Sequence, residues 1–226
     1  MATNDFQRQQ AASGLDQLAA LVRAQSWKQD GTPSLPPTQS AVLRMLDGAG
    51  ATLRAGQVAE RLGVSAASLS DSLKALEAQA WISRQPDPDD GRAVRLALTR
   101  KGRSVARRLN DPGRGLVGLM SGLGEQDLGA LLRVTQLLVY EAQQQGLANG
   151  PRTCLGCRHF QANAGGEAGK PHFCGFIGKA FGDPELRVDC GEQSPAEPGA
   201  VQESVMRFRR MADLRAPAGG PQKATP

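Results

Sequence analysis

All four cysteines of this 226-residue chain lie between Cys154 and Cys190, and the first 153 residues contain none. Their spacing is Cys154-x2-Cys157-x16-Cys174-x15-Cys190. Two cysteines separated by two residues can turn both thiolates towards one metal, and two more complete the four sulfur ligands of zinc or of an iron–sulfur cluster. Four buried cysteines with no common role would not be expected to lie together in this one short segment. We therefore expect a separate four-cysteine metal-binding module.

The segment favours an iron–sulfur cluster, with a [4Fe–4S] cube first, over zinc. Zinc ribbons usually pair two Cys-x-x-Cys knuckles, and this segment has one. The stretches 154–160 and 173–179 resemble the cluster-binding loops of high-potential iron–sulfur proteins, although the third cysteine interval is longer here. A zinc site and a reversible dithiol switch at the knuckle stay open. Because four cysteines fill four positions, His159 and His172 are expected beside the metal or at the surface rather than as ligands.

Before the cysteines, apolar residues recur at helical spacing between Gly- and Pro-rich stretches. We expect helices over 5–29, 38–48, 55–62, 66–79, 101–109 and 125–145, strands at 81–82 and 94–98, and a last helix over 200–214. The first helix and the helix over 125–145 carry apolar stripes that the segment between them cannot cover. A two-fold homodimer would bury these stripes.

Residues 54–80 have the pattern of a helix-turn-helix. Val58 and Leu62 lie on one helix face, Gly63 suits the positive φ of a helix end, and Ser65 can cap the next helix. That helix has its apolar residues on one face and its short polar residues on the other, as a major groove accepts. The outward residues include Ser68, Ser70 and Lys74. An ordinary helical hairpin is the alternative for this segment alone.

A strongly basic run follows this segment, and it favours a DNA-binding helix-turn-helix over an ordinary helical hairpin. The chain carries a net charge of +5, but the segment from Arg92 to Arg114 holds eight basic residues and one acid, so the rest of the chain sums to −2. Such a local gradient is what contact with the phosphates of double-stranded DNA requires. The run starts at a turn-rich tip, where Arg92 could enter a narrow minor groove and Arg95 lies close by.

The stretch 57–80 and the following segment 82–102 resemble the MarR family of bacterial winged-helix regulators, over about residues 10–146. The Asp-Asp-Gly-Arg stretch and the closing Leu-Thr-x-x-Gly are the specific parts. The resemblance implies a homodimer joined through its first and last helices, and release of DNA when a ligand or oxidant acts. Carried over by position, it places Ser65, Ser68, Ser70 and Lys74 in the major groove and Arg92 in the minor groove, with Asp90 bracing Arg92.

Together these patterns predict a mainly α fold with a small β-wing, followed by a small irregular metal-binding module. The expected divisions are a DNA-binding and dimerisation domain over 1–148, the four-cysteine module over 149–195, and a short helix with a disordered tail over 196–226. We expect a cytoplasmic, dimeric transcriptional regulator, with a repressor favoured, whose module senses redox or metal state. A purely structural zinc module or a thiol switch is the alternative, and an electron-transfer protein is disfavoured.

No feature of the sequence indicates an enzyme, a membrane protein or a secreted protein. There is no Ser/His/Asp or Cys/His nucleophile arrangement and no phosphate-cradling loop with Gly-Lys-Ser/Thr. No apolar run approaches the ~18 residues of a membrane span. The N-terminus lacks the charged-then-apolar order of a signal peptide.

Overall fold

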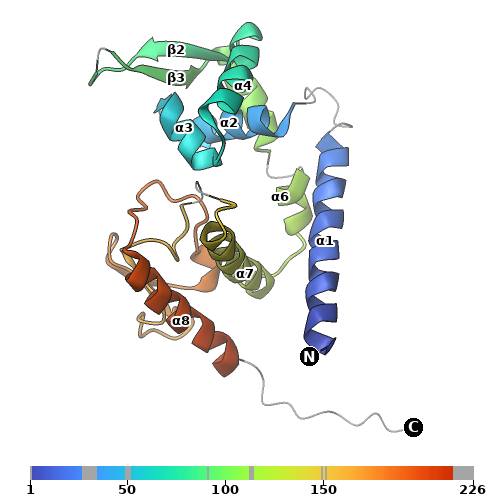
Figure 1. Ribbon diagram of the computed structural model, residues 1–226, viewed down its shortest axis with the longest axis vertical. Coiled ribbons are helices and arrows are strands. Elements are labelled where there is room, and N and C mark those ends of the chain that lie inside the picture. The colour runs from blue at the N-terminus through green and yellow to red at the C-terminus, as the bar shows by residue number, and fades with distance from the viewer. Residues whose placement is uncertain are drawn as a thin grey trace. The chain divides into compact units, whose positions relative to one another are not determined.

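The chain divides into two compact units, Met1–Gly122 and Leu123–Pro226, which are treated separately below. The computed structural model describes residues 2–26, 35–48, 52–90, 92–111, 115–148, 150 and 152–215. Its elements are labelled in Figure 1. None of the described helices is long and apolar enough to cross a membrane.

The first unit is a helical bundle with a small three-stranded sheet (Figure 1). Its elements are α1 (Ala2–Ser26), α2 (Pro37–Gly48), β1 (Leu53–Arg54), α3 (Ala55–Leu62), α4 (Ala66–Ala78), β2 (Ile82–Pro86), β3 (Val94–Leu98), α5 (Arg100–Leu109) and α6 (Gly115–Met120). The strand order is β1-β3-β2 and both pairings are antiparallel. The long hairpin β2–β3 is the wing, in which Ile82 pairs with Leu98 and Pro86 with Val94.

The core of this unit gathers the apolar stripes that the sequence predicts. Its buried members from the helices are Val42, Leu43, Leu46, Val58, Leu69, Leu73, Leu76, Val105 and Ala106, and they pack with Leu53, Trp81, Ile82, Leu96 and Leu98. The predicted winged helix-turn-helix is therefore confirmed as a fold. Strand β1 and helix α6 were not expected, because two and six residues are too short for a clear periodic pattern. Residues 27–29 of the expected first helix lie outside the described residues.

The second unit contains two helices that pack around the cysteine segment. Its described elements are α7 (Glu125–Gln144), β4 (Phe160–Gln161), β5 (His172–Cys174), β6 (Lys179–Phe181), the short 3-10 helix η1 (Asp183–Glu185) and α8 (Pro198–Arg215). The strands form an antiparallel sheet in the order β4-β5-β6, so the segment that the sequence predicts to be small and irregular also contains a short sheet. Strands of two or three residues leave little alternation in a sequence.

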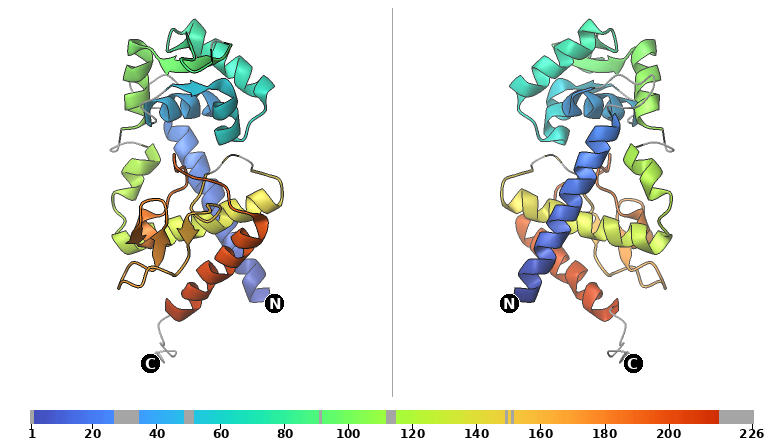
Figure 2. Two further views of the ribbon diagram at one scale, coloured as in Figure 1. Left: turned by 90° about the vertical axis from the view of Figure 1, so that its left-hand side faces the viewer. Right: turned by 90° about the vertical axis from the view of Figure 1, so that its right-hand side faces the viewer.

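The second unit includes α7 and α8, whereas the sequence analysis places domain boundaries near 148 and 195. Leu132, Leu137 and Tyr140 of α7 pack against the core that Phe160 and Leu155 form in the cysteine segment. The described part of α8 contributes buried side chains to the same core, and Figure 2 shows it meeting α7 at an angle, where Arg209 contacts Glu141. The apolar stripe of α7 was visible in the sequence, but its packing partner was not. The tail expected over 216–226 lies outside the described residues.

Candidate DNA-binding surface and four-cysteine site

The turn between α3 and α4 has the geometry predicted for a helix-turn-helix. Gly63 takes the left-handed conformation with φ of 63°, and the next amide, of Val64, donates to the carbonyl of Ala59 at 3.1 Å. The Oγ of Ser65 accepts a hydrogen bond from the backbone N–H of Ser68 at 3.1 Å. Ser65 therefore caps α4, as predicted, and satisfies one of the amides that a helix start leaves without a partner.

Helix α4 exposes two of the three polar residues that the sequence places outward on it. Ser68 and Lys74 are exposed and Ser70 is half-buried, whereas the three leucines of the helix face inwards. The ammonium of Lys74 lies 3.3 Å from Asp71 Oδ1, with both side chains largely in solvent. Exposed ion pairs of this kind contribute little stability, so Lys74 stays available to a partner.

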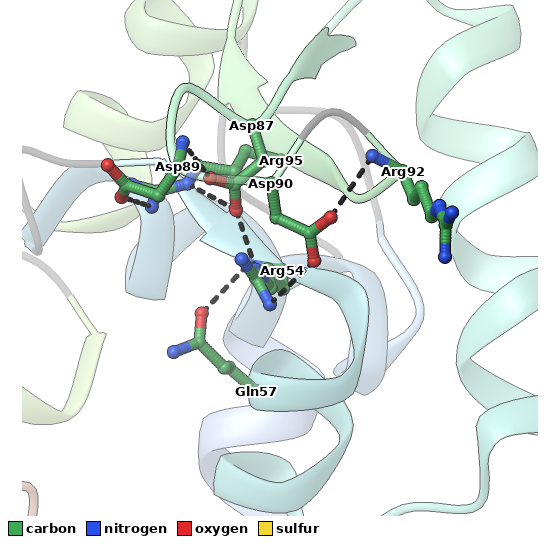
Figure 3. Close-up of polar contacts among 7 residues, drawn as sticks. All are labelled: Arg54, Gln57, Asp87, Asp89, Asp90, Arg92 and Arg95. Carbon is green, nitrogen blue, oxygen red and sulfur yellow. Dashed lines mark hydrogen bonds and ion pairs between the residues drawn. The ribbon is translucent and has the colours of Figure 1, made fainter.

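A buried carboxylate lies beneath the tip of the wing. Asp87 is fully buried, and its Oδ2 lies 2.6 Å from Arg54 Nε and 2.8 Å from Arg95 Nε (Figure 3). Its Oδ1 accepts the backbone N–H of Asp89 at 2.9 Å. The guanidinium of Arg95 first, and that of Arg54 next, hold the pKa of Asp87 well below its usual range. The charged form is therefore the one that the folded wing stabilises.

The two arginines that the sequence assigns to DNA, Arg92 and Arg95, make different contacts in the wing. Arg95 is engaged inside the wing, since its Nη2 also lies 2.9 Å from Asp89 Oδ2. Asp90 accepts the backbone N–H of Arg92 at 3.1 Å and lies 3.6 Å from Arg54 Nη1. It thus holds the main chain of Arg92, while the Arg92 side chain points away from the acids (Figure 3). Within the described part of the wing, no carboxylate pairs with the Arg92 guanidinium.

Sequence reasoning missed Arg54 and Asp87. Three aspartates lie close together at the wing tip, at 87, 89 and 90, and such a cluster indicates that some of them form ion pairs with basic side chains. The partner could not be read from the sequence, because Arg54 reaches the wing only through the pairing of β1 with β3, in which Arg54 lies opposite Arg95. Arg54 is also the N-cap residue of α3, where its backbone N–H donates to Gln57 Oε1 at 2.9 Å.

The low pKa of Asp87 predicts a specific acid sensitivity of the first unit. A carboxyl whose pKa is lower in the folded than in the unfolded state stabilises the fold above its unfolded pKa, about 3.9, and this stability is lost as the pH falls through the folded value. We expect Asp87→Asn to lower the unfolding free energy at neutral pH and to flatten its decline below about pH 5. Urea unfolding followed by tryptophan fluorescence measures this, because both tryptophans belong to this unit.

The matched control is Asp71→Asn, at an exposed carboxylate on α4. It should leave the unfolding free energy and its pH profile close to those of the parent. An Asp87→Asn profile that overlays the parent's from neutral to acid pH would show that the wing does not depend on this carboxylate.

Helix α5 continues the basic surface from the wing. Its exposed basic residues are Arg100, Lys101, Arg103, Arg107 and Arg108. The ammonium of Lys101 also donates to the carbonyl of Gln79 at 3.1 Å, which ties the start of α5 to the end of α4. Arg114, the last basic residue of the run, lies outside the described residues. The exposed basic residues of α5 together offer a positive surface to a polyanion.

The four predicted cysteines of the second unit line one cavity of about 320 Å³. All four are free thiols and each is partly buried. The cavity wall also includes His159, Phe160, Phe176, Ile177, Phe181, Glu185, Arg187, Gly191 and Glu192. The structure thus brings together residues that are separated by up to 36 positions in the chain.

Backbone hydrogen bonds hold the cysteine-bearing segments at the cavity. The N–H of Cys157 donates to the carbonyl of Cys154 at 2.9 Å, which closes the knuckle. Two hydrogen bonds join Cys154 and Arg187. The N–H of Cys154 donates to the Arg187 carbonyl at 3.1 Å, and the N–H of Arg187 donates to the side-chain Sγ of Cys154 at 3.3 Å. Cys174 lies opposite Phe160 in the pairing of β5 with β4. The N–H of Cys190 donates to the carbonyl of Arg152 at 3.1 Å.

Helix α7 is joined to this site by one buried amide side chain. Gln136 is fully buried, and its Nε2 donates to the Arg187 carbonyl at 2.8 Å. Its Oε1 accepts the N–H of Leu155, inside the knuckle, at 3.0 Å. Both segments that contact Cys154 are therefore attached to the same position of α7. Sequence reasoning missed Gln136, since a polar residue within a helix carries no sign of its distant partners.

Burial raises the pKa of the Cys154 thiol to about 11, and each of the other three cysteines raises it further, while the Arg187 amide acts in the opposite direction. Without a metal, Cys154 is therefore protonated at neutral pH. Metal binding at this site would release protons, because a thiolate is the ligand.

The four cysteines share a cavity but do not form a ready-made site for a single metal ion. Within the described residues, no three Cys, His, Asp or Glu side chains are grouped closely enough to hold a single metal ion. All four cysteines nevertheless line one cavity.

The two histidines occupy different environments. His172 is fully buried and does not line the cavity; its Nε2 lies 2.7 Å from Asp183 Oδ1, and its Nδ1 accepts the N–H of Asn163 at 3.4 Å. This network places the ring proton on Nε2, facing the carboxylate. His159 lines the cavity, with its ring 5.6 Å from that of Phe176. His172 therefore belongs to the packing of the unit, and His159 to the cavity wall.

Comparison with known proteins addresses the first unit. Residues 34–93 match the model of the MarR family. The match runs from just before α2 to the tip of the wing, and it does not reach α5 or the cysteine segment. MarR-family proteins are DNA-binding transcriptional regulators and not enzymes. A comparison with curated proteins found no match.

Solved winged-helix structures resemble part of the chain. FabT from Streptococcus pneumoniae, in complex with DNA, is 20% identical over 61% of this chain and 97% of its own, with a TM-score of 0.49. A MarR variant from E. coli complexed with operator DNA is 16% identical over 58% and 91%, with a TM-score of 0.46. A probable transcriptional regulator from Pseudomonas aeruginosa is 26% identical over 55% and 93%, with a TM-score of 0.43.

Proposed function

We propose that this protein is a homodimeric, DNA-binding transcriptional repressor of the MarR type, with a second unit that holds a metal centre. The observation that carries the proposal is the match of residues 34–93 to the MarR family, in a segment folded as a helix-turn-helix and wing. The protein's partner is double-stranded DNA, and its activity is regulated by redox or metal state.

In this proposal α4 enters the major groove, with Ser68, Ser70 and Lys74 near the base edges and Ser65 fixing the helix start. The exposed guanidinium of Arg92 enters the minor groove. Arg95, held by Asp87 and Asp89, keeps the wing in shape and adds positive charge near the phosphates. A preformed wing lowers the ordering cost of binding, so the buried network supports the role of Arg92.

Exposed apolar side chains support a homodimer. On α1, Phe6 is 65% exposed and Leu21 is 58% exposed, and on α6 Val117 is 58% exposed. Helices α1 and α6 contact each other within the first unit, so these side chains lie on neighbouring elements. A two-fold dimer that buries them would present two α4 helices to DNA. Its operator would then be two-fold symmetric, with half-sites about one helical turn apart, ~10 bp.

The second unit supplies the proposed regulation. Gln136 attaches α7 to both segments around Cys154, so a change at the cysteines reaches this helix through two hydrogen bonds. A structural zinc site and a thiol switch at Cys154 and Cys157 are the competing roles. DNA affinity that is equal for metal-free and metal-loaded protein, at one fixed salt concentration, would leave the unit a structural role.

The test of DNA binding is selection of duplexes from a random-sequence pool by the purified full-length protein, followed by titration of the enriched duplex. We expect a two-fold symmetric site, and we expect Arg92→Ala to bind it about tenfold or more weakly, with relaxed preference at the minor-groove positions. The matched control is Arg209→Ala, which removes the same charge from α8 and should bind within about twofold of the parent.

Two outcomes would contradict this account. A pool without any enriched sequence would rule out sequence-specific DNA binding. An Arg92→Ala variant with the affinity and base preferences of the parent would remove the wing from the interface and leave binding to α4 and α5.

A further inference from the structure

We propose that the four cysteines of the second unit ligate one [4Fe–4S] cluster, and that this cluster is the metal centre of the regulator proposed above. The inference depends on that proposed function only for its regulatory meaning, because cluster binding can be measured without DNA. Its ligands are Cys154, Cys157, Cys174 and Cys190.

The geometry of the cavity favours a cluster over zinc. A structural zinc ion draws four sulfurs to ~2.3 Å from one point. Here no three potential ligands of the described residues form such a group, although the four cysteines line the same cavity of about 320 Å³. In a [4Fe–4S] cube each cysteine binds a different iron, so the sulfurs stand apart around a central body. Four cysteines that line one cavity without forming such a close group match this requirement.

The cavity wall also suits a cluster. Phe160 and Phe181 form its buried side, and Phe176 and Ile177 follow Cys174 after one glycine, in the turn between β5 and β6. Such aromatic and aliphatic walls limit access of water, which controls the reduction potential and the stability of a cluster. Phe176 and Ile177 are more than half exposed in the described unit, so they form the outer edge of this wall.

One hydrogen bond to sulfur is already in place. The N–H of Arg187 donates to Cys154 Sγ at 3.3 Å, and Gln136 fixes the carbonyl of the same residue. Amide donors to cysteine sulfur stabilise the negative charge of a thiolate that binds iron.

Assembly balances without a further reagent. Two ferrous and two ferric ions combine with four sulfide ions, and four cysteine thiols lose their protons to the solvent as their thiolates bind iron. Equal amounts of ferrous and ferric iron with sulfide therefore supply the cluster in its resting oxidation state. No electron is added or removed in this step.

The experiment is anaerobic reconstitution of the full-length protein with ferrous iron, ferric iron and sulfide, and in parallel with zinc alone. We expect about four iron and four sulfide per chain, broad visible absorption, and both Fe–S and Fe–Fe distances in iron X-ray absorption. Each single Cys→Ser variant should lose most of this absorption. Met206→Ala, at an exposed side chain of α8, is the control and should keep the full iron content.

The parent protein decides the matter even if a cysteine variant fails to fold. One tightly bound zinc per chain with four sulfur ligands, together with no iron–sulfur cluster on reconstitution, would overturn the inference. A content of about two iron per chain would also overturn the four-iron cluster. Protein that holds the cluster but enriches no duplex would contradict the regulator proposal alone, and protein that enriches a duplex without holding a cluster would contradict this inference alone.

Discussion

Gly102→Ala should destabilise the first unit more than any other single methyl group added to it. A Cβ at this position would lie 1.8 Å from the carbonyl oxygen of Trp81 and 2.6 Å from its carbonyl carbon. These are backbone atoms at the start of the wing, so no side-chain rotation relieves the contact. The carbonyl of Trp81 also accepts the N–H of Thr99 at 3.0 Å, which holds the two segments together.

The expected loss of unfolding free energy is about 3 kcal/mol or more, because α5 has to move away from the wing and loses its packing on α2. Urea unfolding followed by tryptophan fluorescence measures it in this unit. Gly56→Ala is the matched control: Gly56 is exposed in α3, and a Cβ there would meet nothing within 4 Å. It should be neutral or stabilising by up to about 1 kcal/mol. Equal midpoints for Gly102→Ala and the parent would refute the close contact.

Phe208→Ala should have the largest effect in the second unit. Phe208 is completely buried in α8, and its ring lies 5.9 Å from that of Phe160 and 5.3 Å from that of His172. The guanidinium of Arg133, on α7, lies 4.1 Å above the same ring. The ring therefore joins both helices of the unit to the strand that carries Cys174.

Removing this ring leaves a cavity, and we expect a loss of about 3–5 kcal/mol in unfolding free energy. Hydrogen exchange of the peptides that cover α7 and α8 measures the loss in this unit, with parent and variant in the same metal state. Met206→Ala, two residues away and 56% exposed, should change the exchange by less than about 0.5 kcal/mol. Equal protection of the Phe208→Ala variant and the parent would show that α8 does not support the unit.

The sequence by itself determined the features that depend on neighbouring residues. The apolar periods of α2, α3 and α4, the positive φ of Gly63 and the cap at Ser65 follow from interactions within a few residues, and the structure confirms them. The closing Leu-Thr-x-x-Gly has the same character: Thr99 caps α5 by accepting the N–H of Gly102 at 3.0 Å. The need for glycine at that position, however, comes from Trp81, across the wing.

The tertiary structure decided the contacts between residues far apart in the chain. Arg54 reaches Asp87 through a strand pairing, and Gln136 reaches the cysteine knuckle through the packing of α7. Likewise, the pattern of cysteines predicted a shared site, but only the folded unit places all four around one hollow. Spacing specifies which groups can meet locally. The distance and direction between distant groups depend on how helices and strands pack, which no local pattern encodes.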